Sequence, residues 1–189
     1  REQLAERLIC NEASIKSEKM RNGKLEESDW MRFSEATSVL GQANIYLDET
    51  SGITVPEIMA KLRRLPKVDL VLIDYLGLIK GSTKTENRVQ EVSEITRNLK
   101  MMAKDLNIPV VVLAQLARST EGRGKSHKPQ LSDLRESGSI EQDADVIMFL
   151  SREGYYNPEA EEPNKTKCIF AKHRNGAIAD IDMRFRADE

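Results

Sequence analysis

The stretch that decides the fold is VDLVLIDYLGLI, residues 68–79. Four aliphatic residues, 70–73, run directly into an acid, Asp74. An apolar run without alternation is typical of a parallel strand that is buried on both faces. In open α/β sheets, ligands bind beyond the carboxyl ends of the strands. The stretch therefore predicts an α/β fold with a carboxylate at its ligand-binding edge.

Two further apolar stretches repeat the pattern, IPVVVLAQL at residues 108–116 and ADVIMFLSR at residues 144–152. Steps of three and four between apolar residues predict an amphipathic helix from Val89 to Leu106. Strands of this kind separated by helices indicate a mostly parallel sheet flanked by helices. An Asn-Gly turn within residues 167–185 adds an antiparallel hairpin at the C-terminus.

The first third of the chain is predicted to be mainly helical. One helix is expected to end near the Asn22-Gly23 turn, and Ser28 is expected to cap a second. The alternation in NIYLDET, residues 44–50, predicts a short strand. Thr54 and Glu57 have the spacing of a capping box, which predicts the start of a third helix.

Composition narrows the class of protein. The chain has 189 residues, 39% of them hydrophobic and 32% charged, which is typical of one soluble domain. Two cysteines indicate a reducing compartment, the cytoplasm, and two histidines make a zinc site improbable. The net charge is −2, so any nucleic-acid surface must be local. No apolar run reaches the length of a bilayer span.

Two strand ends carry the chemistry, because Asp74 follows the first strand and Gln115 ends the second. A carboxylate can hold Mg²⁺, and an amide can orient an attacking water or contact a γ-phosphate. The alternative is that Asp74 caps a turn and that Gln115 is merely solvated. A phosphate loop is missing, because Gly124-Lys125-Ser126 has Ser119 where the motif needs glycine.

Two basic features suit phosphate groups. Residues 117–135 carry five basic and two acidic residues, a net charge of +3, which suits contact with a nucleic-acid backbone. The alternative for this loop is a basic surface. Lys172 and Arg174 are two residues apart on a predicted strand and should share one face. They form either a phosphate clamp or a solvated edge strand.

Together these stretches resemble the C-terminal motor domain of the DnaB family of replicative DNA helicases, bacterial or phage, within the RecA-like ATPases. The most specific stretch is LRESGSIEQDAD, residues 134–145, and the others are ITVPEIMAKLRRL, VDLVLIDYLGLI, VVVLAQLAR and AKHRNG. The resemblance implies that Asp74 is the Walker B acid at Mg²⁺ and that Gln115 links the γ-phosphate of ATP to DNA binding. Lys172 and Arg174 would reach the ATP of the neighbouring subunit.

The same resemblance implies contacts with single-stranded DNA by the loop of Arg135, Glu136 and Gly138. The basic residues expected to assist are Arg118, Arg123, Lys125 and Lys128. Ala117 departs from the asparagine that many relatives carry. The intact protein would be a homohexamer that uses ATP and Mg²⁺, with primase and a helicase loader as partners and no membrane contact.

Residues 1–189 are thus expected to be a single, partial RecA-like ATPase domain. The N-terminal strand, the phosphate loop and the catalytic glutamate would lie upstream of Arg1, so this piece alone should not hydrolyse ATP. Two alternatives stay open. One is a non-catalytic interaction module with the RecA fold, and the other is a RadA-like recombination ATPase.

Overall fold

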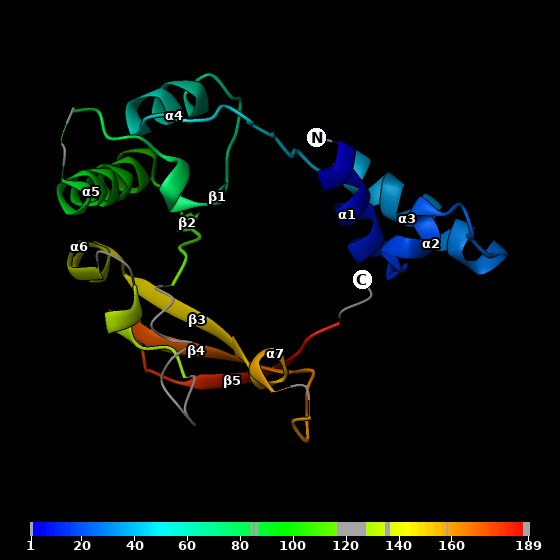
Figure 1. Cartoon of the computed structure of the whole chain (residues 1–189). Helices are drawn as coiled ribbons and strands as arrows, with labels where there is room; N and C mark the ends of the chain where they lie inside the picture. Colours follow the sequence, from blue (N-terminus) through cyan, green and yellow to red (C-terminus); the bar gives the residue numbers. More distant parts are fainter. Residues whose placement is uncertain are drawn as a thin grey trace. The chain divides into compact units, whose positions relative to one another are not determined.

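The computed structural model describes residues 2–83, 85, 87–116, 128–134, 137–157 and 159–186. Two compact units emerge, one from Thr50–Arg184 and the other from the residues up to Glu49 with the end of the chain from Phe185. No helix in the described ranges has the length and apolar character needed to cross a membrane. Figure 1 labels the elements of both units.

The N-terminal unit consists of α1 (Glu2–Ala13), α2 (Ser17–Arg21) and α3 (Glu27–Gln42). The single helix expected up to Asn22 is broken at Ser14, whose φ of 50° lies in the left-handed region. The second helix begins one residue before the predicted cap, because Glu26 and Asp29 form a reciprocal capping box. Ala13, Ile15 and Ala36 form the small core of this unit.

The strand predicted at residues 44–50 is wrong, because these residues form a loop without regular secondary structure. Ile45 and Leu47 are both exposed. No described strand pairs with the segment. A strand needs a neighbour for its backbone hydrogen bonds, so alternation without a partner does not make one.

The larger unit begins with α4 (Val55–Leu62), β1 (Val71–Ile73), the 3₁₀ turn η1 (Leu76–Leu78), α5 (Arg88–Leu106) and β2 (Val110–Val112). The predicted capping box is confirmed, since the Thr54 amide and hydroxyl both donate to Glu57 at 2.8 Å. The predicted amphipathic helix is also confirmed as α5. It buries one face in a core shared with α4, formed by Val55, Leu76, Ile79, Val92, Ile95, Leu99 and Met102.

β1 and β2 are parallel neighbours, with Val71 paired to Val110 and Ile73 to Val112. One face of this pair packs on the core of α4 and α5. The expectation of burial on both faces is wrong for the described residues, because Leu72 is 63% exposed. Its exposed neighbours are Leu70, Val111 and Leu113. Among the described elements of the larger unit, helices cover only one side of the pair.

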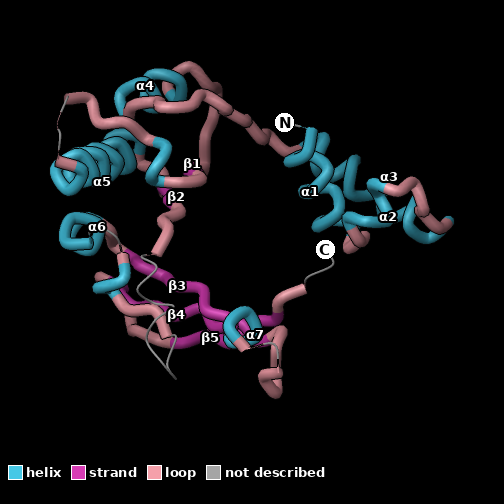
Figure 2. Tube along the Cα trace, in the orientation of Figure 1, coloured by secondary structure: helices cyan, strands magenta, loops and turns pink. Residues whose placement is uncertain are grey.

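The rest of the unit contains η3 (Leu131–Asp133), α6 (Ser137–Asp143), β3 (Val146–Arg152), α7 (Glu153–Tyr156), β4 (Lys165–His173) and β5 (Asp180–Arg184). Figure 2 shows its three strands together in magenta. β3 pairs antiparallel with β4, and β4 pairs antiparallel with β5. The α/β class and the C-terminal hairpin are therefore confirmed.

The pairing of the third apolar strand differs from the expectation. β3 was expected to belong to the mostly parallel sheet, but its described pairing is antiparallel, with β4. Its side chains alternate, with Ile147 and Phe149 buried while Met148 and Leu150 are exposed. An antiparallel pair with one covered face produces this alternation.

Candidate functional site

The candidate site starts at the carboxyl ends of β1 and β2. Hydrogen bonding continues past both strands, since the Leu113 amide donates to Ile73 O at 2.9 Å and the Leu76 amide donates to Leu113 O at 2.8 Å. Asp74 therefore lies beside Leu113, and Leu113 is two residues before Gln115 in the chain. The expectation that the two strands are adjacent and parallel is confirmed, and Asp74 directly follows β1. The second strand is shorter than expected: β2 ends at Val112, so Gln115 lies three residues beyond it.

The environment of Asp74 and Gln115 is open. Both residues are exposed. Counted in steps of two, Asp74 follows Leu72 on the uncovered face of β1, and Gln115, three residues past the end of β2, has the parity of Val111 on that same face. By this count the carboxylate and the amide fall on the side of the pair that no described helix of the larger unit covers.

The donor set fits magnesium better than a transition metal. No group of three or more His, Cys, Asp or Glu side chains that could hold a metal occurs in the part of the chain that is described. Mg²⁺ prefers oxygen ligands, keeps several waters and is commonly held by one or two carboxylates with substrate phosphates. One exposed carboxylate such as that of Asp74 meets this requirement. It cannot by itself form a closed protein cage.

The basic pair lies at the C-terminal end of α6. Lys172 Nζ donates to Glu141 O, and Arg174 Nη2 donates to Gln142 O at 3.2 Å. Both side chains therefore reach the same end of one helix, which agrees with the expectation that they share a face. Both hydrogen bonds are exposed, and the Arg174 side chain is 50% exposed.

An acid that the sequence reasoning did not single out completes this cluster. The carboxylate of Asp145 pairs with Lys100 of α5 and, at 3.4 Å, with Arg174. The hydrogen bond from Lys100, aided by the charges of Arg174 and Lys172, holds the pKa of Asp145 below its ordinary value, against a smaller opposing effect of burial. No local sequence pattern indicates this role, because the contacts of Asp145 depend on the antiparallel register that pairs the start of β3 with the end of β4.

The predicted DNA-binding residues are only partly described. Arg118, Arg123, Lys125, Arg135 and Glu136 lie outside the described residues. Lys128 pairs with Asp180 at 2.9 Å, and Gly138 is an exposed residue of α6. A Cβ at Gly138 would meet no atom of the described residues within 4 Å, so packing among those residues does not require glycine there.

The flanks of the predicted DNA loop are anchored. Leu134 forms an antiparallel bridge with Leu116 and packs in a buried cluster with Ile147, Phe149 and Ile169. On the other flank, Thr96 Oγ1 of α5 donates to Asp143 of α6 at 2.6 Å. The bridge connects the residue after Gln115 with the residue before Arg135.

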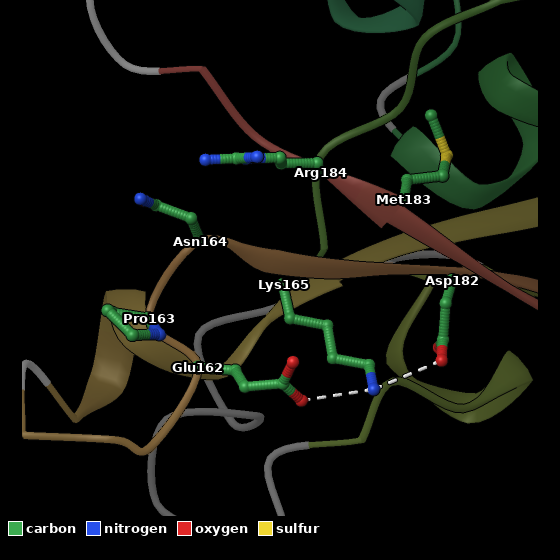
Figure 3. Close-up of a pocket in the computed structure, with 7 residues that line it drawn as sticks. All are labelled: Glu162, Pro163, Asn164, Lys165, Asp182, Met183 and Arg184. Carbon is green, nitrogen blue, oxygen red and sulfur yellow. Dashed lines mark hydrogen bonds and ion pairs between the residues drawn. The ribbon is translucent and has the colours of Figure 1, made fainter.

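A separate hollow lies between β4 and β5 and is lined by Glu162, Pro163, Asn164, Lys165, Asp182, Met183 and Arg184. Figure 3 shows Lys165 between the carboxylates of Glu162 and Asp182. Both pairs are 3.1 Å long, and they raise the pKa of Lys165. Because its charges neutralise one another, this hollow offers no comparable ligand chemistry.

Comparison with solved structures defines the class of protein. The chain aligns with a TM-score of 0.90 and 37% identity to a structure described as a DnaB-like replicative helicase and its interactions with primase, covering 97% of this chain and 45% of that one. It aligns at 0.89 and 37% identity with a second solved structure, described as an ATPase domain, covering 96% of this chain and 66% of that one. The fold is that of a RecA-like helicase ATPase domain.

The chain belongs to the family described as the DnaB-like helicase C-terminal domain, whose sequence model matches residues 1–189. It is 47% identical over 188 residues to the replicative DNA helicase DnaC of Bacillus subtilis and 46% identical to the replicative DNA helicase DnaB of Geobacillus stearothermophilus. In both cases 97% of this chain aligns with 41% of the relative. The chain therefore spans about two fifths of these relatives.

Proposed function

We propose that this chain is the larger part of the motor domain of an ATP-dependent replicative DNA helicase. The intact protein forms a homohexameric ring, binds ATP between subunits, translocates on single-stranded DNA and separates the duplex at the replication fork. The observation that carries this proposal is that β1 and β2 are adjacent and parallel, with Asp74 directly after β1 and Gln115 in the segment that follows β2. Family membership supports the same activity.

In this proposal each candidate residue has a distinct role. Asp74 holds Mg²⁺, which when bound neutralises charge on the phosphates of ATP. Gln115 contacts the γ-phosphate region, and the bridge between Leu116 and Leu134 connects it with the DNA loop. Lys172 and Arg174 act on the ATP of the neighbouring subunit.

The DNA-contacting set in this proposal consists of charged groups and amides rather than a base-reading surface. Such groups favour the phosphate backbone and carry little sequence information. The set contains Arg118, Arg123, Lys125, Lys128, Arg135, Glu136 and Gly138.

The uncovered face of β1 and β2 supports the proposal that residues 1–189 form a partial ATPase domain. Leu70, Leu72, Val111 and Leu113 make an exposed apolar strip on the side assigned to Asp74 and Gln115. This chain covers only 66% of the second solved structure, the ATPase domain. We propose that the remaining part of the intact domain supplies the phosphate loop and the catalytic glutamate and covers this strip.

The partners follow from the same proposal. The solved DnaB-like helicase is described with its interactions with primase, and we propose primase as a partner of the intact protein here. A helicase loader and single-stranded DNA complete the set, and the cytoplasm is the compartment in which they meet.

The test uses the full-length protein with Asp74→Ala. Because Asp74 is exposed and no described side chain bonds to it, the variant should keep its melting temperature and ring assembly. Its DNA-stimulated ATPase and unwinding should fall by about a hundredfold or more, since the metal site is lost. The control is Asp69→Ala, which removes an exposed acid paired with Lys67 just before β1. Wild-type activity in the Asp74 variant would refute the metal role.

One observation favours a second candidate, the non-catalytic interaction module: residues 1–189 contain no phosphate-loop motif. The coding sequence that precedes Arg1 separates the two candidates. A G-x-x-x-x-G-K-[ST] motif there supports the motor, and ATP hydrolysis by the full-length protein excludes the module. A RadA-like recombination ATPase is less favoured, because the relatives reported above are replicative helicases.

A further inference from the structure

The last carbonyl groups of an α-helix have no partner within the helix and favour positive charge. In α6 two of these carbonyls, Glu141 O and Gln142 O, accept hydrogen bonds from Lys172 and Arg174. The basic pair that is proposed to serve the neighbouring subunit thus stabilises a helix of its own subunit in this conformation.

Asp145 holds this arrangement together. Its backbone O accepts a hydrogen bond from the Arg174 amide at 2.8 Å, which ties the ends of β3 and β4. Its carboxylate lies 3.4 Å from Arg174 Nη1 and also pairs with Lys100. The Arg174 guanidinium is therefore held by a carboxylate and by a helix carbonyl at the same time.

These contacts compete with the proposed role in the neighbouring site. A guanidinium uses the same N–H groups to bind a carboxylate, a carbonyl or a phosphate. Here Nη1 faces Asp145 and Nη2 donates to Gln142 O, so a phosphate that takes the Nη1 or Nη2 edge displaces at least part of this arrangement. The side chain has two alternative sets of partners, and their relative free energies set how often it is available.

We propose that Asp145 is a positioning residue that retains Arg174 on the C-terminal end of α6 until the neighbouring subunit presents ATP. The inference rests on the proposed function, because it requires Arg174 to act on a neighbour's nucleotide. Asp145 itself touches no nucleotide and acts only through Arg174.

Retention of Arg174 by Asp145 also affects the stability of α6. This helix begins at Ser137, directly after Arg135 and Glu136 in the sequence, and its core is held by Ile140 and by the hydrogen bond from Thr96 to Asp143. Withdrawal of Arg174 removes a C-terminal partner from a helix of seven residues. Occupancy of the neighbour's ATP site is thereby communicated to the helix that follows the predicted DNA loop.

A substitution of Lys100 should change the availability of Arg174 in the direction opposite to a substitution of Asp145. It shares the Asp145 carboxylate with Arg174, so it weakens the hold of that carboxylate on the arginine. Removal of the lysine charge leaves the carboxylate to Arg174 alone. Asp145→Asn and Lys100→Gln should therefore shift Arg174 in opposite directions, which a loss of structural support at either position would not do.

The experiment measures ATP hydrolysis by the full-length hexamer with and without single-stranded DNA. Asp145→Asn should raise the kcat of the DNA-free reaction about two- to fivefold, the range expected when one exposed ion pair is lost, and leave the KM for ATP unchanged. The stimulation by DNA should fall correspondingly. Lys100→Gln should lower the DNA-free rate.

The matched control is Asp182→Asn. The side chains of Asp145 and Asp182 are similarly exposed, at 52% and 57%, and each pairs with a lysine. Asp182 lies on β5 in the neutral hollow and should leave both rates unchanged. Equal behaviour of the Asp145 and Asp182 variants, or rate changes of the same sign for the Asp145 and Lys100 variants, would overturn the inference.

A third variant separates this inference from the proposed function. Arg174→Ala should lower hydrolysis strongly, and Asp145→Asn added to it should cause no rise in the DNA-free rate. If Arg174→Ala hydrolyses ATP normally, the proposed role of the basic pair fails. If Arg174→Ala is impaired but Asp145→Asn matches its control, only the positioning role fails. If Asp145→Asn does not assemble, the sign of the Lys100→Gln effect decides.

Discussion

Two adjacent methionines on α5 provide a sharp test of which helix face is buried. Met102 is 1% exposed in the core with α4, whereas Met101 is 52% exposed. Complete burial of a methionine side chain is worth about 1.5–3 kcal/mol, and the cavity left by truncation adds to this, so Met102→Ala should cost about 2–5 kcal/mol. Met101→Ala should cost less than about 1 kcal/mol, because methionine and alanine both favour the helical conformation and half of the Met101 side chain is already in water.

The assay is amide hydrogen exchange of α5 peptides in the full-length protein, which reports local opening without assuming a single unfolding transition. A loss of about 2 kcal/mol corresponds to exchange about thirtyfold faster in Met102→Ala. Met101→Ala should exchange within about fivefold of the unaltered protein. Equal acceleration in the two variants, or a larger effect at Met101, would refute the assigned face of α5.

Three further outcomes are expected. Arg174→Ala should lower ATP hydrolysis about a thousandfold, and mixing with subunits that lack a phosphate loop should restore some activity; no rescue at any ratio contradicts action between subunits. Arg135→Ala should weaken binding to all single-stranded sequences alike and reduce the salt slope by about 0.7, so an unchanged slope argues against backbone contact. Hydrogen bonds from the Glu26 amide and Lys19 lower the pKa of Asp29. The stability contributed by the Asp29 carboxylate is present above its ordinary pKa of 3.8 and is lost as the pH falls through its lower folded pKa. Acid unfolding followed by Trp30 fluorescence should therefore show a loss of stability in this pH range for the unaltered protein, and Asp29→Asn should not show it.

Local patterns predicted the local elements well. The capping box at Thr54 and the amphipathic helix α5 depend on contacts within a few residues or on one helix face, and both were predicted correctly. The strand expected at residues 44–50 failed, because alternation describes a surface but does not provide a pairing partner. The antiparallel placement of β3 was missed for the same reason, since its partner β4 lies beyond α7 in the chain.

The sequence also indicated which residues follow the two strands at the candidate site. An acid and an amide following two apolar runs predicted that Asp74 and Gln115 share one edge, because parallel strands end on the same side. The residues that resembled a helicase family led to the family that the comparisons establish. The roles of those residues stay predictions.

The amino-acid sequence by itself determined the α/β class, the start of α4 at its Thr54 cap and the choice of residues that follow the strands, because these depend on near neighbours along the chain. Only the tertiary structure decided that β1 and β2 are covered on one face and that Asp145 lies between Lys100 and Arg174. The reason is physical: Lys100 and Asp145 are 45 positions apart in the chain, and their contact forms only when α5 packs beside α6 and the ends of β3 and β4 pair.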